Sequence, residues 1–167
     1  MSDRHALFPL KSILLPGCIM DLQIFEARYL DLRFAAVGCE AQIVDWQQRD
    51  NGLLGLRIQG RRRGRVSEVQ VAADGLVTAQ VAWLDEQPDQ ALQPEHDDLR
   101  ALHAALLNHP IAEGLGLPAL ADSQQQLGYE LAFLLPFSLD QKSVLLATES
   151  PGVRLQQITE WLELLQA

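Results

Sequence analysis

The sequence changes its hydrophobic period once, at a polar segment that spans residues 86–96. Before this segment, short runs alternate apolar and polar residues between turn signals, which is typical of antiparallel strands. After it, apolar residues recur three and four positions apart, which is typical of helices that bury one face. Pro88 and Pro94 disfavour regular structure within the segment itself. The sequence therefore predicts an α+β chain, with a β lobe over residues 1–87 followed by a helical lobe over residues 88–167.

Turn chemistry defines the first lobe as an antiparallel meander. Asn51 and Gly52 form a pair that tolerates positive φ and favours a hairpin. A second turn is predicted at residues 73–75. Between the two turns, Val66 is out of step with the later valines, which predicts a β-bulge near Ser67.

Helix start signals are clear in the second half. Ser123 and Ser138 are predicted N-caps, because a side-chain oxygen at that position accepts from the first turn. Pro151 suits the first turn of the last helix. The helix after Ser138 is expected to bury Leu139 and the stem of Lys142. The last helix is expected to bury a stripe made of Leu155, Ile158, Trp161, Leu162 and Leu165.

The formal net charge is −9, and the acidity is concentrated in the second half. Residues 1–87 hold 10 Lys/Arg against 11 Asp/Glu, whereas residues 88–167 hold 3 against 11. An acidic surface repels phosphate backbones, so binding of nucleic acid in general is disfavoured. The exception is a basic cluster that contains no acid and consists of Arg57, Arg61, Arg62, Arg63 and Arg65.

Three interpretations of the basic cluster stay open. Arginines along a strand protect an exposed sheet edge from pairing with another chain. The cluster would also suit an acidic segment of another protein. The third interpretation is contact with RNA, although no aromatic residue lies between Arg57 and Val66 to stack on bases. An RNA-associated module is therefore the alternative function.

The histidines of the second half do not form a recognisable metal motif. His96 and His103 are seven positions apart, two helical turns rather than one, and no cysteine lies near them or near His109. We interpret all three as surface side chains and predict no metal site.

Catalytic and cofactor motifs are not recognisable either. Lys11-Ser12 and Lys142-Ser143 are the only candidates for a Ser-Lys nucleophile pair, and adjacent residues on a helix point about 100° apart. Glycine-rich phosphate-binding motifs do not occur. We therefore predict no catalytic residue, no cofactor and no enzyme.

The apolar stretch Leu7–Leu32 is expected to belong to the fold. Pro9 and Pro16 interrupt it, so it fits neither a signal peptide nor a membrane span. Cys18 and Cys39 match no disulfide framework and are expected to be free thiols, which fits a cytoplasmic location.

Three blocks of the sequence closely resemble the N-terminal, substrate-recognition domain family of Lon protease. The first combines "LFPL", a Pro-Gly turn and "IFEARY" within residues 7–29. The second is "VGCEAQIVDWQQRDNGLLGLRIQGRRRGRV" at residues 37–66, and the third is "LAFLLPFSLDQKSVLLATESPGVRLQQITEWL" at residues 131–162. Because they occur in the family's order and span most of the chain, the sequence looks like a stand-alone member.

The resemblance implies a PUA-like β lobe, a pseudo-barrel with one short helix near residues 25–32, packed on a small helical bundle. It also implies a non-catalytic module that binds polypeptides and lacks the ATPase and peptidase parts of Lon. The peptide-binding residues that it implies are Phe8, Pro9, Phe25, Glu26, Arg28 and Tyr29. The alternative for Phe8, Phe25, Arg28 and Tyr29 is that they pack the first helix onto the sheet.

The expected partners follow from the same resemblance. They are unfolded or exposed polypeptide segments, and a protease or chaperone is a further candidate. Neither nucleic acid nor a membrane is an expected partner. The sequence departs from the family at one place, where only residues 33–38 occupy the position of an additional strand pair. Our hypothesis is that a segment is missing between Leu32 and about Ala36.

Overall fold

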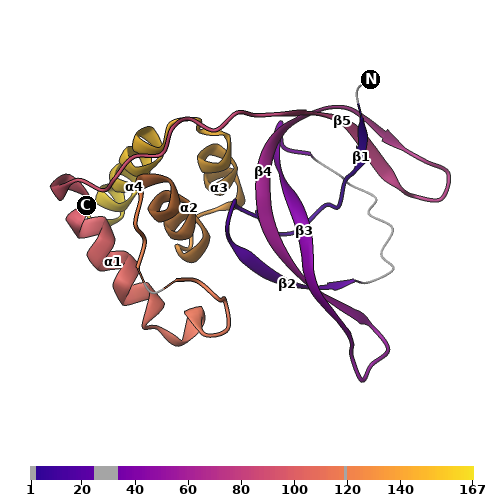
Figure 1. The fold of residues 1–167 in the computed structure, drawn as a ribbon, viewed down its shortest axis with the longest axis horizontal. Coiled ribbons are helices and arrows are strands. Elements are labelled where there is room, and N and C mark those ends of the chain that lie inside the picture. Colours follow the sequence, from indigo (N-terminus) through magenta and orange to yellow (C-terminus); the bar gives the residue numbers. More distant parts are fainter. Residues whose placement is uncertain (1–2, 25–33, 119) are drawn as a thin grey trace.

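The computed structural model describes residues 3–24, 34–118 and 120–167. Its strands gather at one end of the molecule and its helices at the other, joined by a long connection after β5 (Figure 1). The strands are β1 (Arg4–Ala6), β2 (Ile19–Ile24), β3 (Val37–Gln48), β4 (Leu54–Val71) and β5 (Val77–Trp83). The helices are η1 (Pro94–His96), α1 (Asp97–Leu107), η2 (Pro110–Ala112), α2 (Gln124–Leu134), α3 (Leu139–Ala147) and α4 (Pro151–Gln166). The predicted α+β class is confirmed. We call the two ends the β lobe and the helical lobe, and we keep the boundary at residue 87 as a proposal.

β4 is the central strand of the sheet. It pairs antiparallel with β2, β3 and β5, and β1 pairs with β5. In the first half of β4, Ile58 lies opposite Met20 of β2 and Ile43 of β3. The edge-strand interpretation of the basic cluster is therefore wrong, because β4 has neighbours on both sides at Arg57 and at Arg65.

The bulge predicted in β4 is present. The pairing of β4 with β5 shifts register between Ser67 and Gln70, and Glu68 has a φ of 49°. A β-bulge of this kind adds one residue to a strand and increases its local twist.

Gly60 holds the opening segment of the chain against β4. The amide of Gly17 donates to the carbonyl of Gly60 at 2.9 Å, and the amide of Gly60 donates to the carbonyl of Cys18 at 3.0 Å. A Cβ at position 60 would lie 2.1 Å from the carbonyl oxygen of Leu15, so no residue other than glycine fits. This close approach fixes Leu15 and Cys18, both fully buried, in the core.

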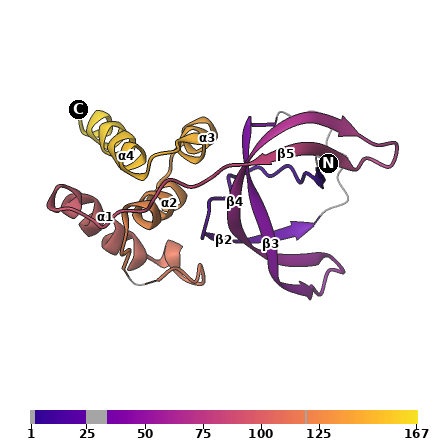
Figure 2. The same cartoon turned by 45° about the horizontal axis from the view of Figure 1, so that its top comes forward.

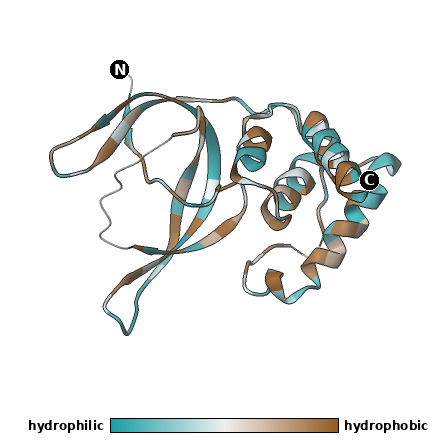
Figure 3. Cartoon of the chain, turned by 180° about the vertical axis from the view of Figure 1, so that it is seen from behind, coloured by the Kyte–Doolittle hydropathy of each residue, from teal (hydrophilic) through white to brown (hydrophobic). Residues whose placement is uncertain are grey.

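The predicted helix starts are confirmed. The Ser123 hydroxyl accepts from the amide of Gln126, and the Ser138 hydroxyl accepts from the amide of Gln141, as N-caps do. Pro151 is the first residue of α4. The helices carry hydrophobic and hydrophilic residues on the same coils (Figure 3), as expected where one face is buried.

One hydrophobic core joins the two lobes. The helices α2 and α3 face the sheet, and α1 and α4 lie farther from it (Figures 1 and 2). Leu15 and Cys18 from the opening segment belong to the same buried cluster as residues of α2, α3 and α4. The helical members include Leu127, Leu131, Leu145, Leu155 and Ile158, each at most 1% exposed.

Two residues predicted to be buried are exposed. Leu165 is 76% exposed, because the core packing of α4 ends at Leu162, one turn before the end of the helix. Leu139 is 49% exposed in the first turn of α3, where Leu145 and Leu146 supply the buried face instead.

The short helix predicted near residues 25–32 lies outside the described residues. So do Leu32 and Arg33, and the hypothesis of a segment missing before Ala36 stays a prediction. No helix within the described ranges has the length and apolar character that a membrane span requires.

Candidate functional site

A groove of about 470 Å³ lies between the two lobes. On the β-lobe side it is lined by Leu10, Lys11, Ser12, Met20, Asp21 and Leu22. On the helical side it is lined by Ile111, Leu115, Phe133, Leu134 and Lys142. The groove thus combines the opening segment and β2 with the loop after α1, the end of α2 and the middle of α3.

The elements around the groove explain its apolar walls. Met20 and Leu22 alternate along β2 and share one face of the strand. Phe133 and Leu134 are the last residues of α2, and Ile111 belongs to η2 and is 62% exposed. Together these side chains form a contiguous apolar surface along the groove, which is typical of a binding site.

Lys142 brings a cation into the groove. Its Nζ donates to the carbonyl oxygen of Phe133 at 3.0 Å, at the end of α2. Partial burial disfavours the charged form and lowers the pKa of Lys142. Lys142 is partly buried and is one of the residues that line the groove.

The carboxylate of Asp21 is neutralised by Arg57. The guanidinium donates to it at 2.8 and 3.0 Å, and this hydrogen bonding lowers the pKa of Asp21. Arg57 also donates to the carbonyl of Gly114 at 3.4 Å. The pair therefore connects β2, β4 and the loop after α1 along one margin of the groove.

Of the six predicted peptide-binding residues, the structure places two. Phe8 is 50% exposed and Pro9 is partly buried; they directly precede Leu10, which lines the groove. The other four, Phe25, Glu26, Arg28 and Tyr29, lie outside the described residues. The predicted set therefore stays a prediction.

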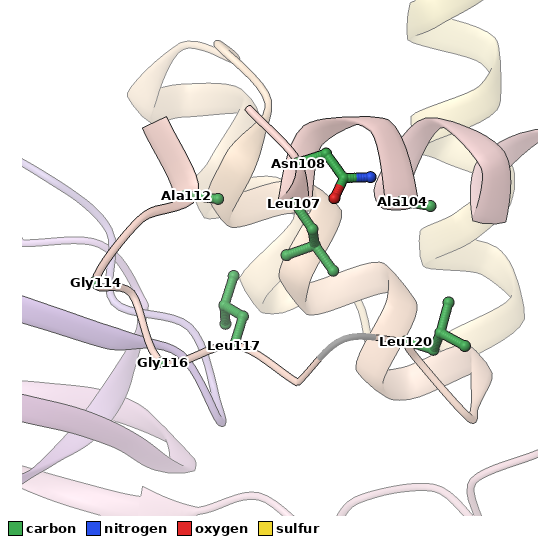
Figure 4. A pocket seen from close by; sticks show the side chains of 8 residues that line it. All are labelled: Ala104, Leu107, Asn108, Ala112, Gly114, Gly116, Leu117 and Leu120. Atoms are coloured by element: carbon green, nitrogen blue, oxygen red, sulfur yellow. The ribbon is translucent and has the colours of Figure 1, made fainter. Parts of the chain in front are cut away.

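A second pocket, also of about 470 Å³, lies within the helical lobe. Figure 4 shows Ala104 and Leu107 of α1, and Asn108 directly after the helix, on one side of it. Ala112, Gly114, Gly116, Leu117 and Leu120 complete its lining. The loop after α1 thus borders both cavities, through Ile111 and Leu115 on the groove and through its glycines here.

The five arginines of the basic cluster do not form one free surface. Arg57 pairs with Asp21, and Arg62 pairs with Glu40 at 2.9 Å. The guanidinium of Arg62 also lies 4.0 Å from the ring of Trp83.

The other three members of the cluster differ sharply in exposure. Arg63 is fully buried, whereas Arg61 and Arg65 are exposed. RNA binding by the cluster stays a prediction.

Arg63 forms part of a buried polar junction that sequence reasoning missed. Its guanidinium donates to both carboxylate oxygens of Glu86, at 2.7 and 3.2 Å. It also donates to the carbonyls of Leu146 and Thr148 at the end of α3, at 2.9 and 3.1 Å. One side chain of β4 therefore ties the sheet to α3 and to the connection after β5.

Arg154 of α4 completes this junction from the helical side. It donates to the carbonyl of Leu145 at 2.9 Å, to the carbonyl of Thr148, and to the Tyr129 hydroxyl at 3.1 Å. Its guanidinium stacks 4.0 Å from the ring of Tyr129. We call Arg63, Glu86, Tyr129 and Arg154 the polar latch.

Two of the histidines are buried, which corrects the prediction that all are surface side chains. His103 is 1% exposed, and its Nε2 lies 2.6 Å from Glu130 Oε2, so that the pair links α1 to α2. His96 is 7% exposed at the start of α1, and only His109 is exposed as predicted. The apolar spacing around His103 is the one signal that could have indicated its burial.

The two cysteines are free thiols with little nucleophilic character. Cys18 is fully buried, and this burial raises its pKa. Burial also raises the pKa of Cys39 to about 12. Because the thiolate is the reactive form, neither residue is activated.

Comparison with known proteins identifies the fold. Over residues 33–163, the sequence matches the family described as the ATP-dependent protease La (LON) substrate-binding domain. A crystal structure of a Lon N-terminal domain protein from Xanthomonas campestris is 35% identical, with a TM-score of 0.74, over 95% of this chain and 98% of that one.

A second solved structure and the curated proteins complete the comparison. The N-terminal domain of the Mycobacterium avium complex Lon protease is 18% identical, with a TM-score of 0.67, over 95% of this chain and 97% of that one; this likeness concerns the fold alone. No curated protein matches significantly. The resemblance seen in the three sequence blocks is confirmed, and the chain belongs to the family of ATP-dependent protease La (Lon) substrate-binding domains.

Proposed function

We propose that this chain is a non-catalytic module that holds exposed, apolar polypeptide segments in the groove between its lobes. The family is described as a substrate-binding domain, and the relative from Xanthomonas campestris aligns along nearly its whole length. The partners would be unfolded or incompletely folded chains in the cytoplasm. In this proposal, Phe8 and Pro9 extend the binding surface beyond Leu10, together with Phe25, Glu26, Arg28 and Tyr29.

The observation that carries the proposal is the composition of the groove. Seven of its eleven lining residues are apolar, and they come from both lobes. Water leaves such walls favourably when an apolar side chain enters, and this driving force does not depend on a particular sequence. A surface of this kind suits partners that share exposed apolar residues and little else.

The polar groups of the groove suit a polypeptide rather than a lipid. Ser12 and Lys142 offer hydrogen-bonding groups beside the apolar walls. An extended chain presents a carbonyl and an amide at every residue, and these must find partners when they leave water. Apolar walls with a few polar groups would satisfy both requirements.

A substitution at the groove margin tests the proposal without disturbing the core. Ile111 is 62% exposed, so Ile111→Ser should leave the free energy of unfolding nearly unchanged. It should weaken binding of a labelled apolar peptide about tenfold, because that equals roughly 1.4 kcal/mol, the scale of burying part of one side chain. Fluorescence anisotropy with the full chain measures this difference.

Leu164→Ser provides the matched control. Leu164 is also an exposed apolar residue, 73% exposed, but it lies near the end of α4 and does not line the groove. This variant should bind the peptide as the parent chain does. Equal weakening by both substitutions, or no saturable binding of any apolar peptide, would contradict the proposal.

A further inference from the structure

We infer that the groove selects polypeptide segments in which a Glu or Asp side chain is flanked by apolar residues, with Lys142 binding the carboxylate. The inference rests on the proposed function, because it names the chemistry of the segment that the same groove holds. Three observations support it: the unused hydrogen-bond donors of Lys142, the charges of the residues that line the groove, and the openness of the groove to solvent.

Lys142 has donors to spare. An ammonium group carries three N–H donors, and one of them is used by the carbonyl of Phe133. Among the described residues, no carboxylate lies within 4.0 Å of Lys142 Nζ. Lys142 lines a groove whose other walls are largely apolar, so the remaining donors are available to a ligand bound there.

The charges of the groove are opposite to those of the whole chain. Lys11 and Lys142 are the two lysines of this sequence, and both line the groove, although the formal net charge is −9. The one acid in the lining, Asp21, is already paired with Arg57. The groove is therefore a cationic site on an acidic protein, and its complement is an anion attached to apolar groups.

Partial burial makes the ammonium a good partner for a carboxylate. The pKa of Lys142 is lowered because burial takes hydration from the charged form. A carboxylate that entered the groove would restore the lost stabilisation through a short, charge-assisted hydrogen bond. A neutral amide of the same shape would restore less of it.

The shape of the groove favours an acidic side chain over the free carboxyl end of a chain. The groove is open to solvent rather than closed around a single residue. A bound segment can therefore continue in both directions, with apolar side chains on Leu22 and Phe133 and its acidic side chain on Lys142. Capture of a chain end would need a closed pocket around the terminal residue.

A pair of peptides tests the inference with the intact chain. Both carry blocked ends and a single central position flanked by Leu and Phe, which is Glu in one peptide and Gln in the other. Isothermal titration calorimetry at low salt should show about tenfold tighter binding of the Glu peptide, a difference typical of one charge-assisted hydrogen bond. The preference should weaken as salt is added.

Variants of the protein identify the residue responsible. Lys142→Met should abolish the preference, whereas Lys142→Arg should keep it because the charge remains. Arg100→Met, which removes an exposed cation of α1 outside the groove, should leave the preference unchanged. An unfolding curve for each variant establishes that it is folded before its binding is compared.

Lysine NMR supplies an independent readout. With isotopically labelled lysine, only Lys11 and Lys142 give side-chain signals, so each can be followed through a pH titration. The pKa of Lys142 should rise when the Glu peptide is bound and change little with the Gln peptide. A merely structural role of Lys142 would not produce this difference.

Four outcomes would overturn the inference. Equal binding of the Glu and Gln peptides, or a Glu preference that survives Lys142→Met, would remove the role of the carboxylate or of Lys142. If a Gln peptide with a free carboxyl end binds more tightly than the blocked Glu peptide, the groove recognises the end of a chain rather than an acidic side chain. Concentration-dependent self-association that peptides do not displace would assign the groove to a second copy. If no peptide binds at all, the proposed function itself fails.

Discussion

The two lobes meet in two ways, and the difference lies in how many polar groups already have partners. At the polar latch, the guanidinium of Arg63 is fully buried and makes four hydrogen bonds. In the groove, the ammonium group of Lys142 is partly buried and makes one hydrogen bond, to Phe133. The latch is occupied by the protein itself, whereas the groove has donors that remain available to a ligand.

The same helix takes part in both contacts. The end of α3 supplies carbonyls to the latch, and Lys142 in its middle reaches the groove. Because the latch fixes α3 against β4, the groove wall has a defined position before any ligand arrives. A preformed wall reduces the entropy that binding must overcome.

One group within the latch departs from this pattern. The Nη1 atom of Arg154 is buried and has no hydrogen-bond partner among the described residues. The ring of Tyr129, 4.0 Å from the guanidinium, offers the group a cation–π contact instead. The stacking is close because Gly128 leaves room for the arginine stem: a Cβ at position 128 would lie 3.1 Å from Arg154 Cδ.

The largest effect is expected from breaking the latch. Arg63→Met should lower the free energy of unfolding by about 4 kcal/mol, because it leaves a carboxylate and a buried carbonyl without their partner. Urea unfolding at constant slope measures the change.

An exposed ion pair provides the control for the latch. Arg62→Met removes the pair with Glu40 and should cost far less stability than Arg63→Met, because water screens an exposed ion pair. If the two variants lose similar stability, the latch does not hold the lobes together.

A second effect, of up to about 3 kcal/mol, is expected from titrating the latch. Burial raises the pKa of Tyr129 to about 12, whereas an unfolded tyrosine titrates near about 10. The folded state therefore keeps the proton longer than the unfolded state does. The resulting stability is fully present below about pH 10 and is lost as the pH rises toward about 12.

Urea unfolding between these pH values checks this expectation. Between about pH 10 and about pH 12 the parent chain should lose more stability than Tyr129→Phe, because phenylalanine has no proton to release. The buried thiols of Cys18 and Cys39 add the same alkaline loss to both chains, so the difference between the two curves isolates Tyr129. If the free energy of unfolding falls equally with pH in the parent chain and in the variant, Tyr129 is exposed to water. Water would then reach the latch, although Arg63 within it is fully buried.

The parts that sequence reasoning predicted depend on local signals. The helix caps at Ser123 and Ser138 and the bulge near Ser67 each follow from a few neighbouring residues. The change of period at residues 86–96 likewise separates strands from helices. Local propensity and pattern therefore predicted the elements of this fold.

The latch depends on contacts that no local signal carries. Arg63 and Thr148 are 85 positions apart, and His103 and Glu130 are 27 apart. A run of arginines in a strand is typical of an exposed surface, yet Arg63 points into the junction because β4 is central. The glycine that follows it, at position 64, is the one sequence sign of tight packing there, since a Cβ would lie 2.4 Å from Val81.

The groove was only partly predictable for a related reason. The sequence predicted a binding role for Phe8 and Pro9, but it did not single out Leu10, which follows them and lines the groove. The opposite wall includes Ile111 and Leu115, which lie in a loop whose sequence gives no sign of its direction. Lys142 was expected to pack only through its stem, because the helical period says nothing about where a long side chain ends.

The smallest effect concerns the groove itself. The pKa of Lys142 is lowered from its usual value of 10.5 by partial burial, so folding disfavours its charged form. The cost to stability is present below the folded-state pKa and disappears as the pH rises toward 10.5, because the unfolded state then also loses the proton. The free energy of unfolding should rise slightly in this window, because solvent screens a group that is only partly buried.

Lys142→Met isolates this effect from all other titrations. The difference in unfolding free energy between variant and parent should favour the variant at neutral pH and shrink as the pH approaches 10.5. This slope is opposite to that of Tyr129, so the two parts of the lobe junction can be separated in one series of urea curves. If the difference does not change with pH, the ammonium group is hydrated like that of any surface lysine. A bound carboxylate would then have no lost hydration to replace, and the contrast between an occupied latch and an available groove would rest on apolar area alone.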